Sequence, residues 1–456
     1  MLAIMAGTLQ AQPLNERLDS MLDEEFLKYS EVGICVYDLT EGRMIYNYND
    51  EKLYRPASIE KIITSVSAID MMGPDFHFDT KISYTGEIRN DTLYGSLYIT
   101  GGFDPLFTDA DMNYLVNEIR KAGIRHIADS IIADVTMTDS VYWGKGWSWD
   151  DCPDTFQPYL SPLMLNEGCV RVDVIPRGGG QAPEVVCTPE SDYYTIINTA
   201  VSHQRGAGPL KITRDWMYQK NNIQIKGSAG SRQSRSLTMF PSDKYFLTTF
   251  CHHLRRDSIT YKEVTFGKEK TTTTSLSQTS RHMRPVLREA LKESNNLCAE
   301  SMFYKAAHRR YGSRATSKQG ASVIQRFIRH RLGLRPNNYN IVDGSGISLY
   351  NYISPRLMVE TLEYAYRHNN IFPHLYDALP ISGVDGTLSW RMTEKNIRSR
   401  VRAKTGSVKG VSSLAGYIKT NSGHALCFCI INQNVMKIGK ARRFQDKICE
   451  ILIKGI

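Results

Sequence analysis

The chain has 456 residues, which is long enough for two or three domains and at least one large hydrophobic core. Hydrophobic residues make up 41% and charged residues 23%, a composition that excludes a disordered chain. Lys and Arg (56) exceed Asp and Glu (47), and the net charge of +9 fits either steering of an anionic substrate or an ordinary, mildly basic protein. Because the basic residues are dispersed and no nucleic-acid motif occurs, we expect no nucleic-acid partner.

The nine cysteines favour neither a zinc site nor a disulfide framework, because their number is odd and no Cys-x-x-Cys occurs. Cys427 and Cys429 alternate in an apolar strand and are predicted to be buried. Cys152, Cys169 and Cys187 leave one disulfide open if the compartment is oxidising.

No apolar run approaches the ~20 residues that span a bilayer, so we predict no membrane span. Residues 1–13 are apolar and small and resemble the end of a secretory signal, but they lack a basic start and a full apolar region. A truncated signal and an ordinary chain terminus both fit, and we favour the truncated signal of an exported protein.

In chain order, the first elements are a helix and a hairpin. Apolar residues at helical spacing mark an amphipathic helix over 14–26. Two strand-like runs, 32–37 and 44–48, flank a turn at 40–43 and predict a hairpin.

The segment Arg55-Pro56-Ala57-Ser58-Ile59-Glu60-Lys61 then leads into a helix with one buried face, which ends at Gly73-Pro74. Ser58 falls at the first turn, and Lys61, three residues on, is its neighbour on the helix surface. A serine needs a nearby base to act as a nucleophile, and a lysine serves only when burial or a second cation lowers its pKa. Alone, this pattern is common on solvated helices.

From about residue 78 the pattern changes to strands, with one helix near 112–119. Residues 140–240 are rich in Gly, Pro, Ser and Thr and indicate a small β-rich module. Helices resume at Pro285. The chain then ends in three strand-like runs and a helix, at 401–404, 414–418, 425–431 and 444–452.

Two further motifs complete a set with Ser58-x-x-Lys61. Ser294-Asn295-Asn296 lies between two predicted helices, and Lys404-Thr405-Gly406 lies in a predicted edge strand. Each motif is weak singly, but all three in this order are typical of penicillin-binding proteins and class A β-lactamases.

Each residue of the set has an expected role in acyl transfer. Ser58 is the nucleophile and Lys61 its general base. Lys404 is the second cation, which keeps Lys61 neutral and attracts a carboxylate. Ser294 relays a proton toward the leaving amine, and Asn296 holds the substrate amide.

The residues after Lys404 are expected to bind substrate. Thr405 hydrogen-bonds the terminal carboxylate of a peptide, and Gly406 lets a substrate strand lie close to the backbone. The backbone N–H groups of Ser58 and Ser407 form the expected oxyanion hole.

Over nearly its whole length the chain resembles the penicillin-binding D-alanyl-D-alanine carboxypeptidases and endopeptidases of the class C low-molecular-mass group. The resemblance implies an α+β fold, with a β-lactamase/transpeptidase-like core of five antiparallel strands flanked by helices and with smaller inserted β-rich domains. It also implies acylation of Ser58 by the penultimate D-alanine, release of the last D-alanine and hydrolysis, with no metal and no cofactor. Some members also cut cross-bridges. The segments that carry the resemblance are 55–61, 101–105, 294–300, 343–348, 383–388 and 403–407.

The resemblance also implies partners and organisation. Substrates are peptidoglycan stem peptides ending in D-Ala-D-Ala, β-lactams are inhibitors that leave Ser58 slowly, and the location is periplasmic or otherwise peripheral to the cell wall. Asp343 and Ser345 would support the cleft floor. The expected domains are a catalytic domain of 14–77 and 272–456, an inserted domain II of 78–160 and 241–271, and a β-rich domain III of 161–240.

Two alternatives stay open. A serine β-lactamase needs a deacylation base after the second motif, but Glu300 is in a helix, and Leu165-Asn166-Glu167 precedes the motif. A non-catalytic penicillin-recognising sensor or scaffold need not retain Ser58 together with Lys61, so the catalytic interpretation is favoured.

Overall fold

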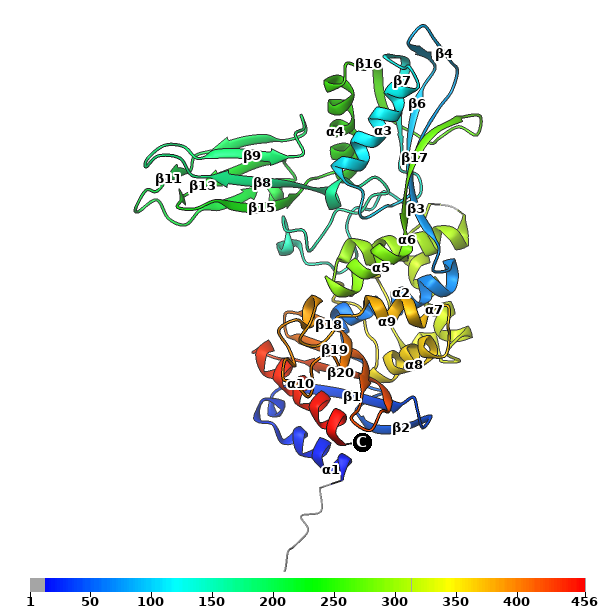
Figure 1. Cartoon of the computed structure of the whole chain (residues 1–456), viewed down its shortest axis with the longest axis vertical. Coiled ribbons are helices and arrows are strands. Elements are labelled where there is room, and N and C mark those ends of the chain that lie inside the picture. The colour runs from blue at the N-terminus through cyan, green and yellow to red at the C-terminus, as the bar shows by residue number, and fades with distance from the viewer. Residues whose placement is uncertain (1–12, 313, 456) are drawn as a thin grey trace, which may run out of the picture.

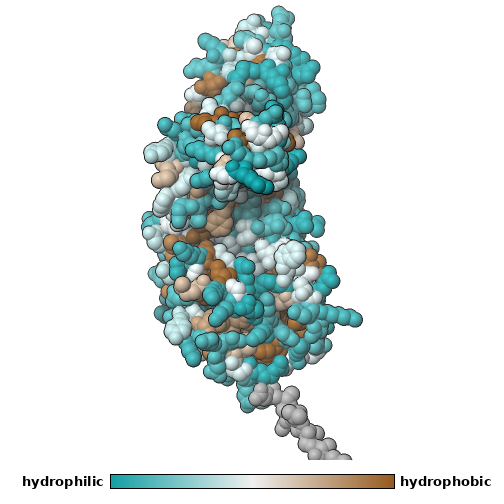
Figure 2. Space-filling model, turned by 90° about the vertical axis from the view of Figure 1, so that its left-hand side faces the viewer, coloured by the Kyte–Doolittle hydropathy of each residue, from teal (hydrophilic) through white to brown (hydrophobic). Residues whose placement is uncertain are grey.

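The structure is a computed structural model that describes residues 13–312 and 314–455, so the candidate signal remnant at 1–13 lies almost wholly outside the described residues. The molecule is elongated, with α1 and α10 together at one end and the strands of the middle of the chain at the other (Figure 1). The face in Figure 2 is mostly hydrophilic, with small separate hydrophobic patches.

Five antiparallel strands form one sheet in the order β18-β19-β20-β1-β2. β1 (Glu31–Asp38) and β2 (Arg43–Tyr48) are the predicted hairpin. The end of the chain supplies β18 (Val401–Val408), β19 (Val411–Lys419) and β20 (Ala425–Gln433). The two ends of the chain thus meet where β1 pairs with β20, and the predicted five-stranded core is confirmed.

Helices cover both faces of this sheet, because its strands alternate side chains between two cores. Ile34 packs in the core that contains residues of α1 and α10, whereas Cys35 packs in the core that contains residues of α2, α5, α6 and α8. The helices of this half are α1 (Leu14–Asp19), α2 (Glu60–Met72), α5 (Met283–Lys292), α6 (Asn296–Tyr311), α7 (Ser317–His330), α8 (Pro355–Tyr366), α9 (Phe372–Ala378) and α10 (Ile438–Gly455).

The segment between α2 and α5 builds a second sheet, in the order β17-β3-β6-β7-β5-β4, with β16 paired to β7. Helices α3 and α4 share a hydrophobic core with it. The elements are β3 (His77–Tyr84), β4 (Glu87–Arg89), β5 (Thr92–Tyr94), β6 (Leu97–Gly101), α3 (Asp109–Lys121), β7 (His126–Asp134), α4 (Ser242–Arg256), β16 (Thr260–Phe266) and β17 (Thr274–His282).

Three small sheets lie between β7 and α4, in the stretch whose composition indicated a β-rich module. Their strand orders are β15-β8-β9, β10-β13-β12 and β11-β14. The strands are β8 (Cys169–Ile175), β9 (Glu184–Thr188), β10 (Thr195–Asn198), β11 (Val201–Ser202), β12 (Lys211–Arg214), β13 (Asn222–Lys226), β14 (Ser228–Ala229) and β15 (Gln233–Thr238).

One strand bears on the proposed domain boundaries. β17 falls within the expected catalytic range 272–456, but it pairs with β3 from Thr274 opposite Tyr84 to His282 opposite His77. Sheet membership therefore places the end of the insertion near His282. The division into domains stays a proposal, and we now place the boundary between inserted domain II and the second catalytic segment near His282 instead of at 271/272.

All nine cysteines are free thiols, so the disulfide that the sequence left open is not formed. Cys427 and Cys429 are buried in β20, as predicted. Among the described helices, none combines the length and the apolar character that crossing a membrane requires.

Candidate active site

Ser58 lies in a short 3-10 turn, Ala57–Ile59, that leads directly into α2. Ala57 has a φ of 51°, a left-handed conformation that costs energy for a residue with a side chain. The Ser413 hydroxyl of β19 donates to the Pro56 carbonyl oxygen at 2.6 Å. The central sheet therefore holds the strained turn, and Ser58 itself is only 7% exposed.

The Lys61 side chain is fully buried one turn further along. Its Nζ lies 2.9 Å from Ser58 Oγ, 2.6 Å from Asn296 Oδ1 and 2.7 Å from the Ser345 carbonyl oxygen. A neutral amine has two N–H donors and one lone pair. Asn296 and Ser345 offer only acceptors and take the two N–H groups, so the lone pair is left for the Ser58 O–H.

Burial is the largest cause that lowers the pKa of Lys61, to about 7, while the charges of Asp343 and Glu300 act in the opposite direction. We expected Lys404 to keep Lys61 neutral, but burial is the main cause. Burial also lowers the pKa of Lys404 well below its usual value, and the charge of Lys61 adds to this effect.

Strand β18 brings Lys404 to the second motif. Lys404 Nζ donates to Ser294 Oγ at 2.8 Å and to the Thr405 carbonyl oxygen at 2.8 Å. Ser294 has a left-handed φ of 63°, and the Asn295 side chain caps α6 by accepting from the Cys298 N–H at 3.0 Å. The cap fixes the start of α6, where Asn296 is the first residue.

Gly406 lies where β18 approaches the Ser58 turn, and no larger residue fits there. A Cβ at this position would lie 2.8 Å from the Pro56 carbonyl oxygen and 3.0 Å from the Ser58 nitrogen. The same Cβ would lie 2.1 Å from Ser413 Oγ of β19, so the glycine lets β18 lie close to both β19 and the Ser58 turn. The room that we expected it to leave for a substrate strand stays a prediction. Ser407 follows on the same strand and its Oγ accepts from Arg442 at 3.3 Å.

Buried carboxylates lie beneath Lys61. Glu300 Oε1 accepts from the N–H groups of Gly344 and Ser345 at 3.0 and 2.8 Å, and burial raises the pKa of Glu300 to about 8. Asp343 begins the same loop, and its Oδ1 accepts from the Gly346 N–H at 2.8 Å. These bonds set the path of the loop that carries the Ser345 carbonyl to Lys61.

Sequence reasoning missed three residues that contact the site. Thr387 and Thr405 share a hydrogen bond between their hydroxyls at 2.8 Å. Trp147 and the Phe156 carbonyl reach the site from the inserted segment. Thr387 lies within a segment that carried the family resemblance, so the sequence could have revealed it. No local pattern links Trp147 to Asp343 or Phe156 to Asn296.

We expected the Asn296 side chain to hold the substrate amide, but its own amide group already makes hydrogen bonds within the protein. The Asn296 amide Nδ2 donates to the Phe156 carbonyl oxygen at 2.6 Å, while its Oδ1 accepts from Lys61. Both ends of the amide are therefore engaged within the protein. Within residues 13–312 and 314–455, no group of three or more His, Cys, Asp and Glu side chains is placed to hold a metal ion.

A serine hydrogen-bonded to a buried lysine, beside an edge strand carrying Lys-Thr-Gly, defines the class of penicillin-recognising serine enzymes. The family model for D-Ala-D-Ala carboxypeptidase 3 (S13) matches residues 14–454, so the chain belongs to that family. This confirms the resemblance that the motifs indicated.

Curated relatives agree with this assignment, and solved structures show the same fold. The chain is 26% identical to the D-alanyl-D-alanine carboxypeptidase DacB of Haemophilus influenzae, over 90% of this chain and 86% of that protein. It is also 26% identical to a D-alanyl-D-alanine carboxypeptidase of Actinomadura, over 92% and 80% of the two chains. The crystal structure of penicillin binding protein 4 (dacB) from Haemophilus influenzae has a TM-score of 0.84 at 24% identity, covering 96% and 99% of the chains. A second structure of that protein, with a TM-score of 0.79 and 23% identity over the same shares, is complexed with a β-lactam.

Proposed function

We propose that the chain is a serine-type D-alanyl-D-alanine carboxypeptidase that acts on peptidoglycan stem peptides through an acyl-enzyme on Ser58. The observation that carries the proposal is the 2.9 Å contact between Ser58 Oγ and the buried amine of Lys61. Membership of the S13 family and two relatives named as D-alanyl-D-alanine carboxypeptidases support the same activity.

In acylation, neutral Lys61 takes the proton of Ser58 while Oγ attacks the carbonyl carbon of the penultimate D-alanine. The backbone N–H groups of Ser58 and Ser407 receive the developing oxyanion. When the peptide bond breaks, the leaving amine of the last D-alanine needs a proton, which returns from Lys61 by way of Ser294. Water then attacks the ester, Lys61 takes the water proton, and Ser58 recovers its hydrogen.

Lys404 and Thr405 bind the terminal carboxylate in this proposal. Lys404 is buried, and among the described residues its Nζ donates to two neutral acceptors, Ser294 Oγ and the Thr405 carbonyl oxygen. A substrate carboxylate would pair with it and raise its pKa. The Thr405 hydroxyl can turn from Thr387 to the same carboxylate. A free carboxylate beside the scissile bond is what distinguishes a carboxypeptidase substrate.

The proposal extends to inhibitors and location. A β-lactam offers a strained amide to the same nucleophile, and the β-lactam complex of the Haemophilus influenzae protein supports inhibition of this chain too. Because stem peptides lie outside the cytoplasmic membrane, we infer that the protein is exported and peripheral to the cell wall.

The test is incubation with a soluble stem pentapeptide ending in D-Ala-D-Ala, followed by mass spectrometry. We expect a tetrapeptide and one equivalent of free D-alanine, and intact pentapeptide would contradict the proposal. Cross-linked fragments in a parallel assay show whether the chain is also an endopeptidase. Rapid turnover of penicillin would favour the β-lactamase alternative instead.

A further inference from the structure

The inserted segment reaches both groups that hold the N–H donors of Lys61. One group is the Asn296 side-chain oxygen and the other is the Ser345 carbonyl. Each is fixed by a residue from the segment after β7, which belongs to the insertion and not to the catalytic sheet.

The first link runs through Phe156. Its carbonyl oxygen accepts from Asn296 Nδ2 at 2.6 Å, and a carbonyl accepts only. The nitrogen end of the amide must therefore face Phe156, so the oxygen end faces Lys61. Without this acceptor, the amide could rotate and present N–H groups to the lysine.

The second link runs through Trp147, whose side chain is buried. Trp147 Nε1 donates to Asp343 Oδ2 at 2.8 Å. Asp343 also accepts from the N–H groups of Gly346 and Ser348, which closes the loop around Ser345. The loop is tight, since a Cβ on Gly346 would lie 2.0 Å from the Ala57 carbonyl oxygen.

Backbone contacts beside Trp147 lock the two segments together. The Ser348 hydroxyl donates to the Lys145 carbonyl oxygen at 2.8 Å, and the Leu349 N–H donates to the Gly146 carbonyl oxygen at 3.1 Å. Gly146 has a φ of 77°, and a Cβ there would lie 2.6 Å from Ser348 Oγ. The backbone at Gly146 is therefore in tight contact with the loop that carries Ser348, and a side chain at this position would not fit.

We propose that segment 145–156 of the insertion orients the general base, with Trp147 as a positioning residue that acts through Asp343 and the Ser345 carbonyl. By fixing both acceptors, the segment aims the lone pair of Lys61 at the Ser58 hydroxyl. The inference rests on the proposed function for its rate predictions, but not for its structural readout.

The test replaces Trp147→Phe, which keeps an aromatic ring in the core and removes the N–H. The matched control is Trp143→Phe, because the Trp143 ring lies 5.9 Å from that of Trp147 and its indole makes no hydrogen bond to a described residue. Steady-state kinetics are measured with the pentapeptide, and thermal unfolding shows that both variants are folded.

We expect Trp147→Phe to lower kcat by about tenfold with KM unchanged, the loss typical of one hydrogen bond to a charged group. A loosened loop would also admit water to Lys61. Because burial lowers the pKa of Lys61, this water should raise that pKa and move the acid limb of the pH profile to higher pH. The kcat of the Trp143→Phe control should stay within about twofold of the wild-type kcat. Equal kcat and equal pH midpoints for the two variants would overturn the inference.

A readout without turnover separates this inference from the proposed function. The titration of Lys61 is followed by NMR in protein labelled with ¹³C-lysine, assigned with Lys61→Arg. A midpoint that moves up in Trp147→Phe and stays in Trp143→Phe supports the inference even if wild type releases no D-alanine. An unmoved midpoint in Trp147→Phe contradicts it even if wild type is active.

Discussion

Lys61 is a fully buried amine whose pKa burial lowers to about 7. Only its neutral form has a lone pair for the Ser58 proton. We therefore predict that kcat/KM for D-alanine release rises as pH increases through about 7 and levels above it. A pH profile measured between pH 5 and 9 checks this. A rate that stays flat across neutrality would mean that Lys61 is not the base.

Lys404 supplies a second prediction at the same scale. Lys404→Ala should reduce acylation by about 100-fold, comparable to losing a preorganised electrostatic group. The fold should survive, because in the described part of the chain Lys404 donates to the Ser294 hydroxyl and the Thr405 carbonyl, so the change leaves no buried carboxylate unpaired there. The rate of labelling by a fluorescent penicillin and the melting temperature test the two parts.

The exposed Lys409, which follows the same strand, gives the control. Lys409→Ala should label at the wild-type rate. If Lys404→Ala unfolds, the lysine is structural and its electrostatic role is unsupported.

The sequence located the candidate nucleophile, the candidate base and the proposed second cation, because each lies in a motif of three or four residues. The sequence did not reveal which residues pack around these side chains in the folded protein. Burial of Lys61, and not a second cation, lowers its pKa, and burial depends on residues distant in sequence such as Ser345 and Asn296. Such effects belong to the tertiary structure.

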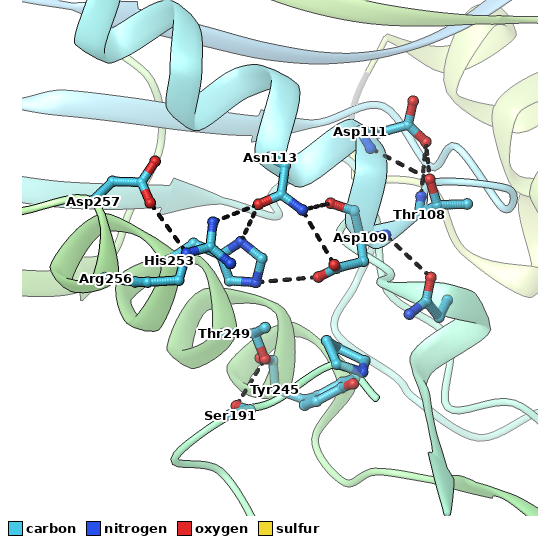
Figure 3. A network of polar contacts seen from close by, with 12 residues as sticks. Thr108, Asp109, Asp111, Asn113, Ser191, Tyr245, Thr249, His253, Arg256 and Asp257 are labelled. Atoms are coloured by element: carbon cyan, nitrogen blue, oxygen red, sulfur yellow. Dashed lines mark hydrogen bonds and ion pairs between the residues drawn. The ribbon is translucent and has the colours of Figure 1, made fainter. Parts of the chain in front are cut away.

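Polar contacts join the helices α3 and α4 of the insertion. Figure 3 shows His253 of α4 between Asn113 and Asp109 of α3. His253 Nδ1 lies 2.9 Å from Asn113 Oδ1, and Nε2 lies 3.1 Å from Asp109 Oδ1. The hydrogen bond from His253 is the largest cause that holds the pKa of Asp109 below its usual value.

We predict that Asp109→Asn lowers the free energy of unfolding by about 1 kcal/mol at pH 7, because a hydrogen bond to a charged group is weakened. A depressed carboxyl pKa stabilises the fold above the ordinary aspartate value and ceases to do so as pH falls through the folded pKa. The difference from wild type should therefore shrink in acid. Urea unfolding at pH 7 and pH 3 measures it.

Asp75→Asn is the control, since the Asp75 side chain is 91% exposed. It should change the free energy of unfolding by less than about 0.5 kcal/mol. Asp109→Asn should leave kcat for the pentapeptide unchanged, because the side chains that bond the Asp109 carboxylate are His253 and Asn113, and neither is a candidate site residue. Equal stability of Asp109→Asn and wild type at pH 7 would show that the network does not stabilise the helix pair.

At the scale of elements, periodicity predicted the hairpin of β1 and β2 and the three C-terminal strands close to their observed bounds. The local sequence carries the bounds of a strand, because the side chains of each strand alternate between the two hydrophobic cores on either face of the sheet. Pairing is different. The strand β17 follows the insertion in sequence yet joins β3, and only the register of the folded sheet reveals that.

For the whole molecule, the resemblance predicted the α+β core and its long insertion between the first and second motifs. It could not predict that the insertion contacts the candidate active site, because Trp147 and Asp343 lie in separate parts of the chain and meet only after folding. Composition likewise excluded a disordered chain and indicated a β-rich module in the insertion, but it did not reveal the role of the insertion.

The measurement that tests the central claim most directly is mass spectrometry of the protein after brief treatment with benzylpenicillin. We predict one covalent adduct with the mass of the intact inhibitor, carried by Ser58 in the peptide map and absent from Ser58→Ala. An unmodified chain, or an adduct that persists on Ser58→Ala, would contradict the claim that Ser58 is the nucleophile.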